Sequence, residues 1–233
     1  MLEAEFDQFA AEYRDQHAAS IRLSGETPDY FAKYKIEDIA RLLSRSCRTP
    51  EKILDFGGGV GNSLPYMSEA FLDSSIVLLD PSKESLGIAQ ARFPGKAEFQ
   101  HYDGKAIPFE KNSFDLIFAA CVFHHIPAHL HIGLLREIER VLAPGGSLFL
   151  YEHNPLNPLT LHAVSNCPFD TNAVLVRARE MRKRIVAAGF KKAEVTYRFF
   201  FPRPLAVFRV FERFLTRVPL GAQYYVHAVK PDA

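Results

Sequence analysis

The sequence has few of the features that mark several large protein classes. Its three cysteines, Cys47, Cys121 and Cys167, are odd in number and widely spaced, which argues against a disulfide framework. The formal net charge is +1, so no excess of one sign draws the chain toward nucleic acid or an anionic surface. No apolar run approaches the roughly 18–20 residues of a membrane-spanning helix, and the acidic start lacks the apolar segment of a secretory signal. We therefore expect a cytoplasmic protein without a transmembrane segment or a nucleic-acid partner.

The sequence does have the composition and alternation of an α/β domain. Hydrophobic residues make up 48% of the 233 residues and charged residues 24%, which is enough for a sizeable core. Apolar runs that predict strands alternate with segments of helical periodicity, and this order favours a parallel sheet with helices on both faces. Helices expected over 2–18 and 27–43 form a cap over residues 1–46, followed by one domain over 47–233. Within that domain we expect a further helix over 172–188 and a helical insertion at about 202–219.

The chain is organised around the segment 52–62, which reads KILDFGGGVGN. Gly57, Gly59 and Gly61 permit a sharp turn from strand to helix, and they clear side chains from the helix N-terminus. Asp55 ends the first strand, where open α/β sheets bind ligands. The dinucleotide pattern G-x-G-x-x-G would need a glycine at the position of Asn62, so a nicotinamide-dependent oxidoreductase is disfavoured.

The pattern D-x-G-x-G-x-G resembles motif I of class I S-adenosylmethionine-dependent methyltransferases, and the resemblance extends over about 50–230. It implies a Rossmann-like sheet of seven mostly parallel strands, with the last strand antiparallel. It also implies that S-adenosylmethionine is the cofactor and S-adenosylhomocysteine the product. The cofactor-binding residues that it suggests are Tyr13, Asp55, Gly57, Gly59, Gly61, Asp80, Pro81, Asp103, Gly104 and Cys121.

Asp80 is the residue of this set that general sheet geometry also supports. It ends the second apolar run and lies about 20 residues beyond the glycine loop, the interval at which an acid receives ribose hydroxyls. The alternative is an acid that stabilises the N-terminus of the helix expected from Lys83. Asp103, after the third strand, is expected from the resemblance to accept a hydrogen bond from the adenine amino group, with the Gly104 N–H against the ring.

Histidines follow the fourth and fifth strands, where a methyl acceptor would enter. His153 is the leading candidate for a general base with a pKa near neutrality, and His125 is the alternative. Either could instead be a structural histidine. His124, His125, His129 and His131 also suggest zinc, yet no carboxylate or cysteine completes a ligand set at a usual spacing, so we predict no metal site.

The predicted function is methyl transfer to a small-molecule acceptor, preferably at a hydroxyl oxygen. A non-catalytic nucleotide-binding or regulatory module of the same fold is the alternative. Between 199 and 219 aromatic and aliphatic residues recur at helical spacing with arginines between them. Such a segment can lie on a membrane surface or pack on the sheet. We therefore keep an apolar or lipid-linked molecule among the candidate acceptors.

Overall fold

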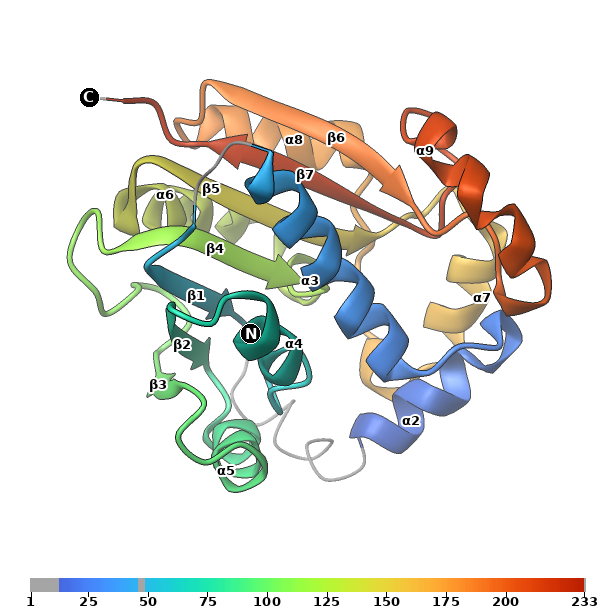
Figure 1. The fold of residues 1–233 in the computed structure, drawn as a ribbon, viewed down its shortest axis with the longest axis horizontal. Coiled ribbons are helices and arrows are strands. Elements are labelled where there is room, and N and C mark those ends of the chain that lie inside the picture. Colours follow the sequence, from blue (N-terminus) through green and yellow to red (C-terminus); the bar gives the residue numbers. More distant parts are fainter. Residues whose placement is uncertain (1–12, 46–48, 233) are drawn as a thin grey trace.

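The computed structural model describes residues 13–45 and 49–232, and they form one mixed sheet covered by helices (Figure 1). The strand order is β3-β2-β1-β4-β5-β7-β6. Neighbouring strands are parallel from β3 to β5, whereas β7 runs antiparallel to both β5 and β6. The expected seven-stranded Rossmann-like sheet with a reversed last strand is therefore confirmed.

The strands are β1 (Lys52–Phe56), β2 (Ser75–Asp80), β3 (Glu98–His101), β4 (Phe114–Ala120), β5 (Leu142–His153), β6 (Lys192–Arg198) and β7 (Gln223–Val229). Those in the middle of the sheet are apolar along their length because both faces are covered. Four of the five residues of β1 are buried, as are five of the six residues of β2. Asp55 and Asp80 are the acids within these buried runs, and a function other than packing must account for them.

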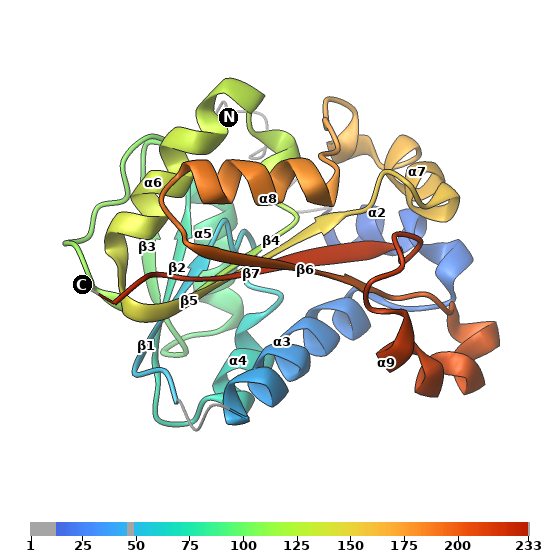
Figure 2. The ribbon, with the colours of Figure 1, turned by 90° about the horizontal axis from the view of Figure 1, so that it is seen from above.

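The α-helices are α2 (Tyr13–Ser20), α3 (Pro28–Ser44), α4 (Leu64–Ala70), α5 (Lys83–Arg92), α6 (His131–Val141), α7 (Pro158–Ser165), α8 (Ala178–Ala187) and α9 (Glu212–Leu215). The 3₁₀ segments are η1 (Arg22–Ser24), η2 (Phe123–His125), η3 (Ala128–Leu130), η4 (Pro168–Asp170) and η5 (Arg203–Phe211). Figure 2 shows α6 and α8 on one face of the sheet, with α3 and α4 on the other.

Each face of the sheet has its own hydrophobic core. On one face Leu135 of α6 and Ile185 of α8 pack against inward side chains of β4, β5 and β7. On the other face Ile36 and Ile39 of α3 and Met67 of α4 pack against β1, β2 and β4. Helix α3 thus shares a core with the sheet, while its first turns extend past the sheet edge. The division into a cap over 1–46 and a domain over 47–233 stays a prediction, since residues 1–12 and 46–48 lie outside the described part.

Two expected helical segments are present but differ in detail from the expectation. The helix expected over 172–188 begins at Ala178, and residues 173–177 before it form neither helix nor strand. Within that stretch the Val174 N–H donates to the His124 carbonyl at 2.8 Å. The insertion at 202–219 is a 3₁₀ segment followed by the single turn of α9, with Leu205 outside helical geometry after the ring of Pro204. Its apolar side chains, among them Val207 and Phe214, are exposed instead of packed on the sheet.

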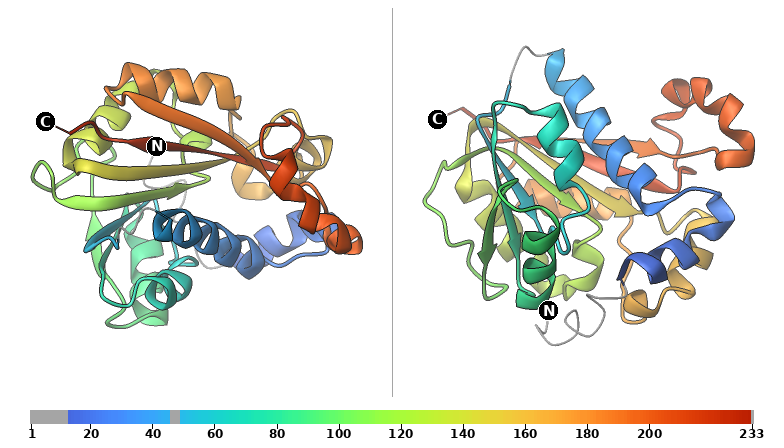
Figure 3. Two further views of the ribbon diagram at one scale, coloured as in Figure 1. Left: turned by 45° about the horizontal axis from the view of Figure 1, so that its top comes forward. Right: turned by 60° about the horizontal axis from the view of Figure 1, so that its bottom comes forward.

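The segments outside the sheet and its covering helices gather at one end of the molecule. Figure 3 shows α2, α7 and the insertion at the end toward which β4 and β5 point. Helix α7 contacts η1, and the Arg209 guanidinium reaches from the insertion to Glu26 at 2.7 Å. The carboxyl ends of the parallel strands are therefore enclosed, which is where an open α/β sheet binds its ligand. No helix in the described ranges is long and apolar enough to cross a membrane.

Candidate functional site

A pocket opens at the carboxyl ends of β1, β2, β4 and β5, below the first turns of α3. Polar side chains reach it from two sides, which we name by their composition. The acidic edge consists of Asp55, Gly59 and Asp80, and the histidine edge consists of His124, His125, Glu152, His153 and Asp170. Of these, all but the buried Glu152 line the pocket directly. Phe31 and Lys35 of α3 also line it, so residues of the expected N-terminal cap contribute to the site.

Asp80 is held by backbone groups on both of its oxygens. Its Oδ2 accepts from the Gly59 N–H at 2.9 Å, and its Oδ1 accepts from the Ser82 N–H at 2.8 Å. Helix α5 is capped by Ser82, whose hydroxyl accepts from the Ser85 N–H at 3.0 Å. Asp80 is therefore not the cap residue, and its carboxylate is fixed at the pocket wall beside the glycine loop.

The three glycines of the D-x-G-x-G-x-G pattern differ in what surrounds them. All three have positive φ, at 70° for Gly57, 53° for Gly59 and 78° for Gly61. A Cβ on Gly57 would lie 2.6 Å from Val122, and one on Gly61 would lie 3.1 Å from Leu64. A Cβ on Gly59 would meet nothing within 4 Å. Gly57 and Gly61 are thus explained by close packing, whereas the space beside Gly59 belongs to the pocket.

Asp55 is the carboxylate of this edge that packing does not explain. It is buried, and its Oδ2 makes no hydrogen bond to any residue in the described ranges. Burial, followed by the negative charge of Asp80, raises the pKa of Asp55 to about 7. A ligand that brings positive charge or hydrogen-bond donors to this corner would relieve both effects. The residues present therefore fit a cofactor with cationic and hydroxyl groups.

Other residues that the resemblance suggested are placed less directly. Pro81 and Cys121 line the pocket, whereas Asp103 and Gly104 belong to an exposed loop that does not. The Asp103 carboxylate accepts from the N–H groups of Lys105 and Ala106, and these bonds lower its pKa. The adenine contact stays a prediction. Tyr13 begins α2, but its side chain lies outside what the structure describes.

The histidine edge is built on a buried ion pair. His124 Nδ1 lies 2.6 Å from Glu152 Oε2, and both side chains are 1% exposed. Burial alone would lower the pKa of His124, but the carboxylates of Glu152 and Asp170 raise it to about 10. Burial would raise the pKa of Glu152, yet the charge of His124 holds it below its usual value. Glu152 Oε1 also accepts from the Phe123 N–H at 2.7 Å, so this carboxylate fixes η2 onto the end of β5.

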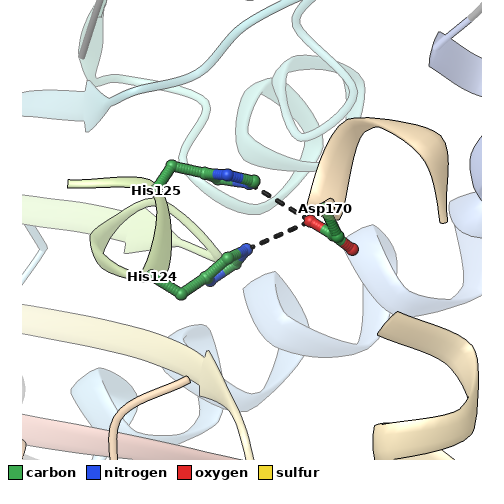
Figure 4. Close-up of side chains that lie close together, drawn as sticks. All are labelled: His124, His125 and Asp170. Carbon is green, nitrogen blue, oxygen red and sulfur yellow. Dashed lines mark ion pairs between the residues drawn. The ribbon is translucent and has the colours of Figure 1, made fainter. Parts of the chain in front are cut away.

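Asp170 is the functional residue that sequence reasoning missed. It ends η4, and its Oδ1 lies 3.4 Å from His124 Nε2 and 3.3 Å from His125 Nε2 (Figure 4). Burial would raise the pKa of Asp170, but the contacts with both imidazoles hold it well below its ordinary range. The structure therefore brings a carboxylate to the histidine cluster that spacing along the chain did not indicate. No local spacing could have revealed it, because the two segments meet only through tertiary folding.

His153 and His125 lie on the same side of the pocket, so both base candidates can face an acceptor. The rings of His124 and His153 lie 5.2 Å apart. Burial, followed by the positive charge of His124, lowers the pKa of His153 to about 4. Burial also lowers the pKa of His125. The expectation of a near-neutral pKa for His153 was wrong, because a charged neighbour accompanies its burial. Its imidazole is therefore unprotonated at neutral pH.

Between the two edges stands Cys121, at the end of β4. It has a positive φ of 59°, which is unusual for a residue other than glycine. Its N–H donates to the Tyr151 carbonyl at 2.8 Å, and the Lys35 ammonium lies 3.9 Å from its sulfur. Burial raises the pKa of the Cys121 thiol. The chain holds this strained residue where its backbone turns along the pocket, and such strain concentrates at functional sites.

A second, more apolar pocket adjoins the first. The two share Phe31 and His153, and the second extends toward the start of the insertion at Pro202. Its other apolar lining residues are Ile21, Leu23, Leu159, Ala163, Phe199, Phe200 and Ala222. His153 thus stands at the junction of a polar pocket and an apolar one.

Comparison with known sequences identifies the domain that carries the glycine loop. Residues 54–150 match the family model described as a methyltransferase domain. Over 119 residues the chain is 35% identical to trans-aconitate 2-methyltransferase of Methylobacterium nodulans, a match that covers 51% of this chain and 45% of that protein. Over 130 residues it is 32% identical to the ubiquinone/menaquinone biosynthesis C-methyltransferase of Cellvibrio japonicus, a match that covers 52% of this chain and 51% of that protein. The chain thus matches about half the length of these relatives.

Comparison with solved structures extends the likeness to the whole fold. An S-adenosylmethionine-dependent methyltransferase of Thermotoga maritima superposes with a TM-score of 0.67 at 17% identity, over 97% of this chain and 98% of that one. A phosphoethanolamine N-methyltransferase of Haemonchus contortus, in complex with S-adenosylmethionine, has a TM-score of 0.57 at 20% identity, over 79% of this chain and 50% of that one. The fold is that of the class I methyltransferases.

Proposed function

We propose that this chain, whose residues 54–150 form a methyltransferase domain, transfers the methyl group of S-adenosylmethionine to the oxygen of a small molecule with an apolar part. The observation that carries the proposal is the meeting of the acidic and histidine edges in one pocket. One edge offers acceptors for a cationic, hydroxyl-bearing cofactor, and the other offers an unprotonated imidazole. A cofactor-binding module without chemistry would need the first edge alone.

The acidic edge is suited to hold the cofactor. Asp80 is fixed by two backbone N–H groups and can accept further hydrogen bonds from ribose hydroxyls at the pocket wall. Asp55, whose Oδ2 has no hydrogen bond to a described residue, can accept from the cofactor's positively charged groups. Gly59 leaves its side of the loop open for close approach of the ligand to the backbone.

The histidine edge is suited to act on the acceptor. S-adenosylmethionine, when bound, supplies an activated methyl group, so the protein's main contribution is alignment. For a hydroxyl acceptor, the O–H proton must leave as the oxygen takes the methyl group. His153 Nδ1 or Nε2 can receive it, because burial and the charge of His124 keep this imidazole unprotonated.

The adjoining apolar pocket supports an acceptor that carries hydrocarbon. It shares His153 with the polar pocket, so a molecule seated there would present one end to the base. The relatives named above act, by their names, on acceptors as different as trans-aconitate and quinone precursors. Acceptor identity and the choice of oxygen are therefore proposals that rest on this chain's own pocket.

Two measurements test the proposal in sequence. Calorimetry of the full chain should give saturable binding of S-adenosylmethionine and S-adenosylhomocysteine, with no binding of NAD as the matched control. Formation of S-adenosylhomocysteine should then be followed with a panel of hydroxylated compounds, paired with and without an alkyl tail. Turnover that favours the tailed member of each pair is expected. Cofactor binding without turnover on any acceptor would support a non-catalytic module, and absence of cofactor binding would overturn the proposal.

A further inference from the structure

We propose that His124, His125 and Asp170 bind one divalent transition-metal ion, with zinc the best match, through His124 Nε2, His125 Nε2 and Asp170 Oδ1. One ligand atom of each side chain lies within 4.8 Å of the other two, at the wall of the pocket (Figure 4). Metal binding at this point stands on the geometry of the cluster alone. A role for the metal in holding the acceptor rests in addition on the proposed function.

The distances within the cluster suit metal coordination better than hydrogen bonding. Zinc lies about 2.0–2.2 Å from nitrogen and oxygen ligands, so two ligands of a tetrahedral site are about 3.3–3.5 Å apart. Asp170 Oδ1 lies 3.4 Å from His124 Nε2 and 3.3 Å from His125 Nε2. All three atoms are within 4.8 Å of one another. Two of the three separations therefore already match those of a zinc site, and the third, between the two imidazole nitrogens, is at most 4.8 Å.

Asp170 supplies a second, independent observation. Its side chain is 5% exposed, and its Oδ1 makes no hydrogen bond of normal geometry to any residue in the described ranges. A buried carboxylate oxygen whose polar contacts are ion pairs at 3.3 and 3.4 Å is incompletely satisfied, and a bound cation is one of the groups that can satisfy it. The oxygen points toward the two imidazole nitrogens, as Figure 4 shows.

Glu152 orients the ligand histidine. It accepts from His124 Nδ1 at 2.6 Å, which leaves Nε2 as the ring atom that faces Asp170. Metal-binding histidines usually donate their second ring N–H to a carboxylate in this way, which fixes the tautomer and increases the basicity of the ligand. Glu152 is itself fixed through its other oxygen by the Phe123 N–H. The metal would take the place of the proton on Nε2, and that proton leaves to solvent.

The ligand types select the kind of metal. Two imidazole nitrogens with one carboxylate suit zinc, iron, cobalt or nickel, whereas magnesium and calcium prefer oxygen ligands throughout. Three protein ligands leave a position open, as in catalytic zinc sites. That position would face the pocket, where an acceptor hydroxyl could bind the ion and lose its proton more readily. This inference departs from the sequence-based expectation of no metal site, which considered spacing along the chain alone.

Metal binding is tested on the full chain without any methyl donor. Protein freed of metal by chelation is titrated with Zn²⁺ against a chromophoric competitor, and with Co²⁺ followed by visible absorption. We expect one equivalent to bind, with the strong visible bands of four-coordinate cobalt. Asp170→Asn, which keeps the side-chain volume and removes the charge, should weaken Zn²⁺ binding at least 100-fold. His129→Ala, which removes an exposed histidine near the cluster, is the matched control and should bind as the original chain does.

The result that overturns the inference is substoichiometric binding by the original chain, or equal affinity in the Asp170→Asn chain. Because Asp170 is buried, His125→Gln serves as a second variant, and the thermal transition of each variant shows whether it is folded. Titration of S-adenosylmethionine in the presence of a chelator separates the two proposals. If the cofactor binds but zinc does not, the proposed function stands and the metal site is refuted. If zinc binds but the cofactor does not, the metal site stands and the proposed function is refuted.

Discussion

The acidic and histidine edges of the pocket occupy equivalent places in the sheet, yet they are prepared for opposite tasks. Both lie at the carboxyl ends of parallel strands. On the acidic edge, burial and the negative charge of Asp80 raise the pKa of Asp55 to about 7. On the histidine edge, Glu152 and Asp170 hold the charge of His124, whose pKa rises to about 10.

The difference shows how one pocket can separate binding from chemistry. The acidic edge is electrostatically incomplete and gains from a ligand, so changes there should affect affinity. The histidine edge is cross-linked by its own ion pairs, so changes there should affect stability or turnover. Four substitutions, ordered from the largest expected effect to the smallest, test this division.

Gly59→Val should abolish measurable binding of S-adenosylmethionine, a loss of at least about 1000-fold. The valine Cβ would enter the pocket, and its branched side chain opposes the φ of 53°. Gly95→Val is the matched control, because Gly95 has a φ of 72° and open space around it but lies outside the pocket. Calorimetry should show normal binding for the control. Normal binding by Gly59→Val would remove the glycine loop from the cofactor site.

Glu152→Gln should lower the free energy of unfolding by about 3–5 kcal/mol, because it leaves the buried charge of His124 without its closest partner. Denaturant titration of the protein freed of metal measures the loss, because a metal on His124 Nε2 would replace the proton that gives the imidazole its charge. Glu180→Gln, which removes the half-exposed pair with Arg184, is the control and should cost at most about 1 kcal/mol.

The pH dependence of that loss follows from the two pKa shifts. The raised pKa of His124 stabilises the fold fully below its ordinary value of 6.5, and this contribution disappears as pH rises through about 10. The lowered pKa of Glu152 stabilises the fold above its ordinary value of 4.5, and this contribution disappears as pH falls. The difference between the original chain and Glu152→Gln should therefore be largest between these two ordinary values. A difference that grows toward pH 10 would contradict the ion pair.

His153→Ala should lower kcat by about 100-fold or more and leave cofactor affinity within about threefold, because the imidazole faces the acceptor. The kcat of the original chain should fall as pH drops through about 4, the pKa of His153. The variant's pH profile should not show this fall. His129→Ala, which removes an exposed histidine that lines neither pocket, is the control. If His125→Ala instead loses turnover and His153→Ala does not, the base is His125. If neither does, the enzyme acts by alignment alone.

Asp80→Asn should weaken S-adenosylmethionine binding by about 1.5–3 kcal/mol, the range for hydrogen bonds to a charged group. It should also lower the stability of the fold, because asparagine keeps one acceptor oxygen for the N–H groups of Gly59 and Ser82. Calorimetry gives the first value and thermal denaturation the second. Asp103→Asn is the natural comparison, because Asp103 lies in an exposed loop outside the pocket. If Asp103→Asn loses more S-adenosylmethionine affinity than Asp80→Asn, the contact of Asp103 with adenine contributes more to binding than the contact of Asp80 with the ribose.

The sequence by itself determined the sheet and the acidic edge. Buried strands that end in Asp55 and Asp80 are visible as apolar runs, and the glycine loop between them is continuous in the chain. Because these features depend on neighbours in sequence and on the rule that parallel strands end at a common edge, the glycine loop and both acids could be placed before the fold was known. The placement of Asp55, Gly59 and Asp80 around one pocket agrees with that reasoning.

Only the tertiary structure decided the histidine edge. Asp170 comes from η4 and reaches His124 and His125 in space, and the Val174 N–H, four residues further on, donates to the His124 carbonyl. The pKa of His153 depends on burial and on the charge of His124, and neither can be read from its place after β5. Contacts between distant segments and the electrostatics of buried groups arise only when the chain is packed, so spacing in the sequence carries no signal for them.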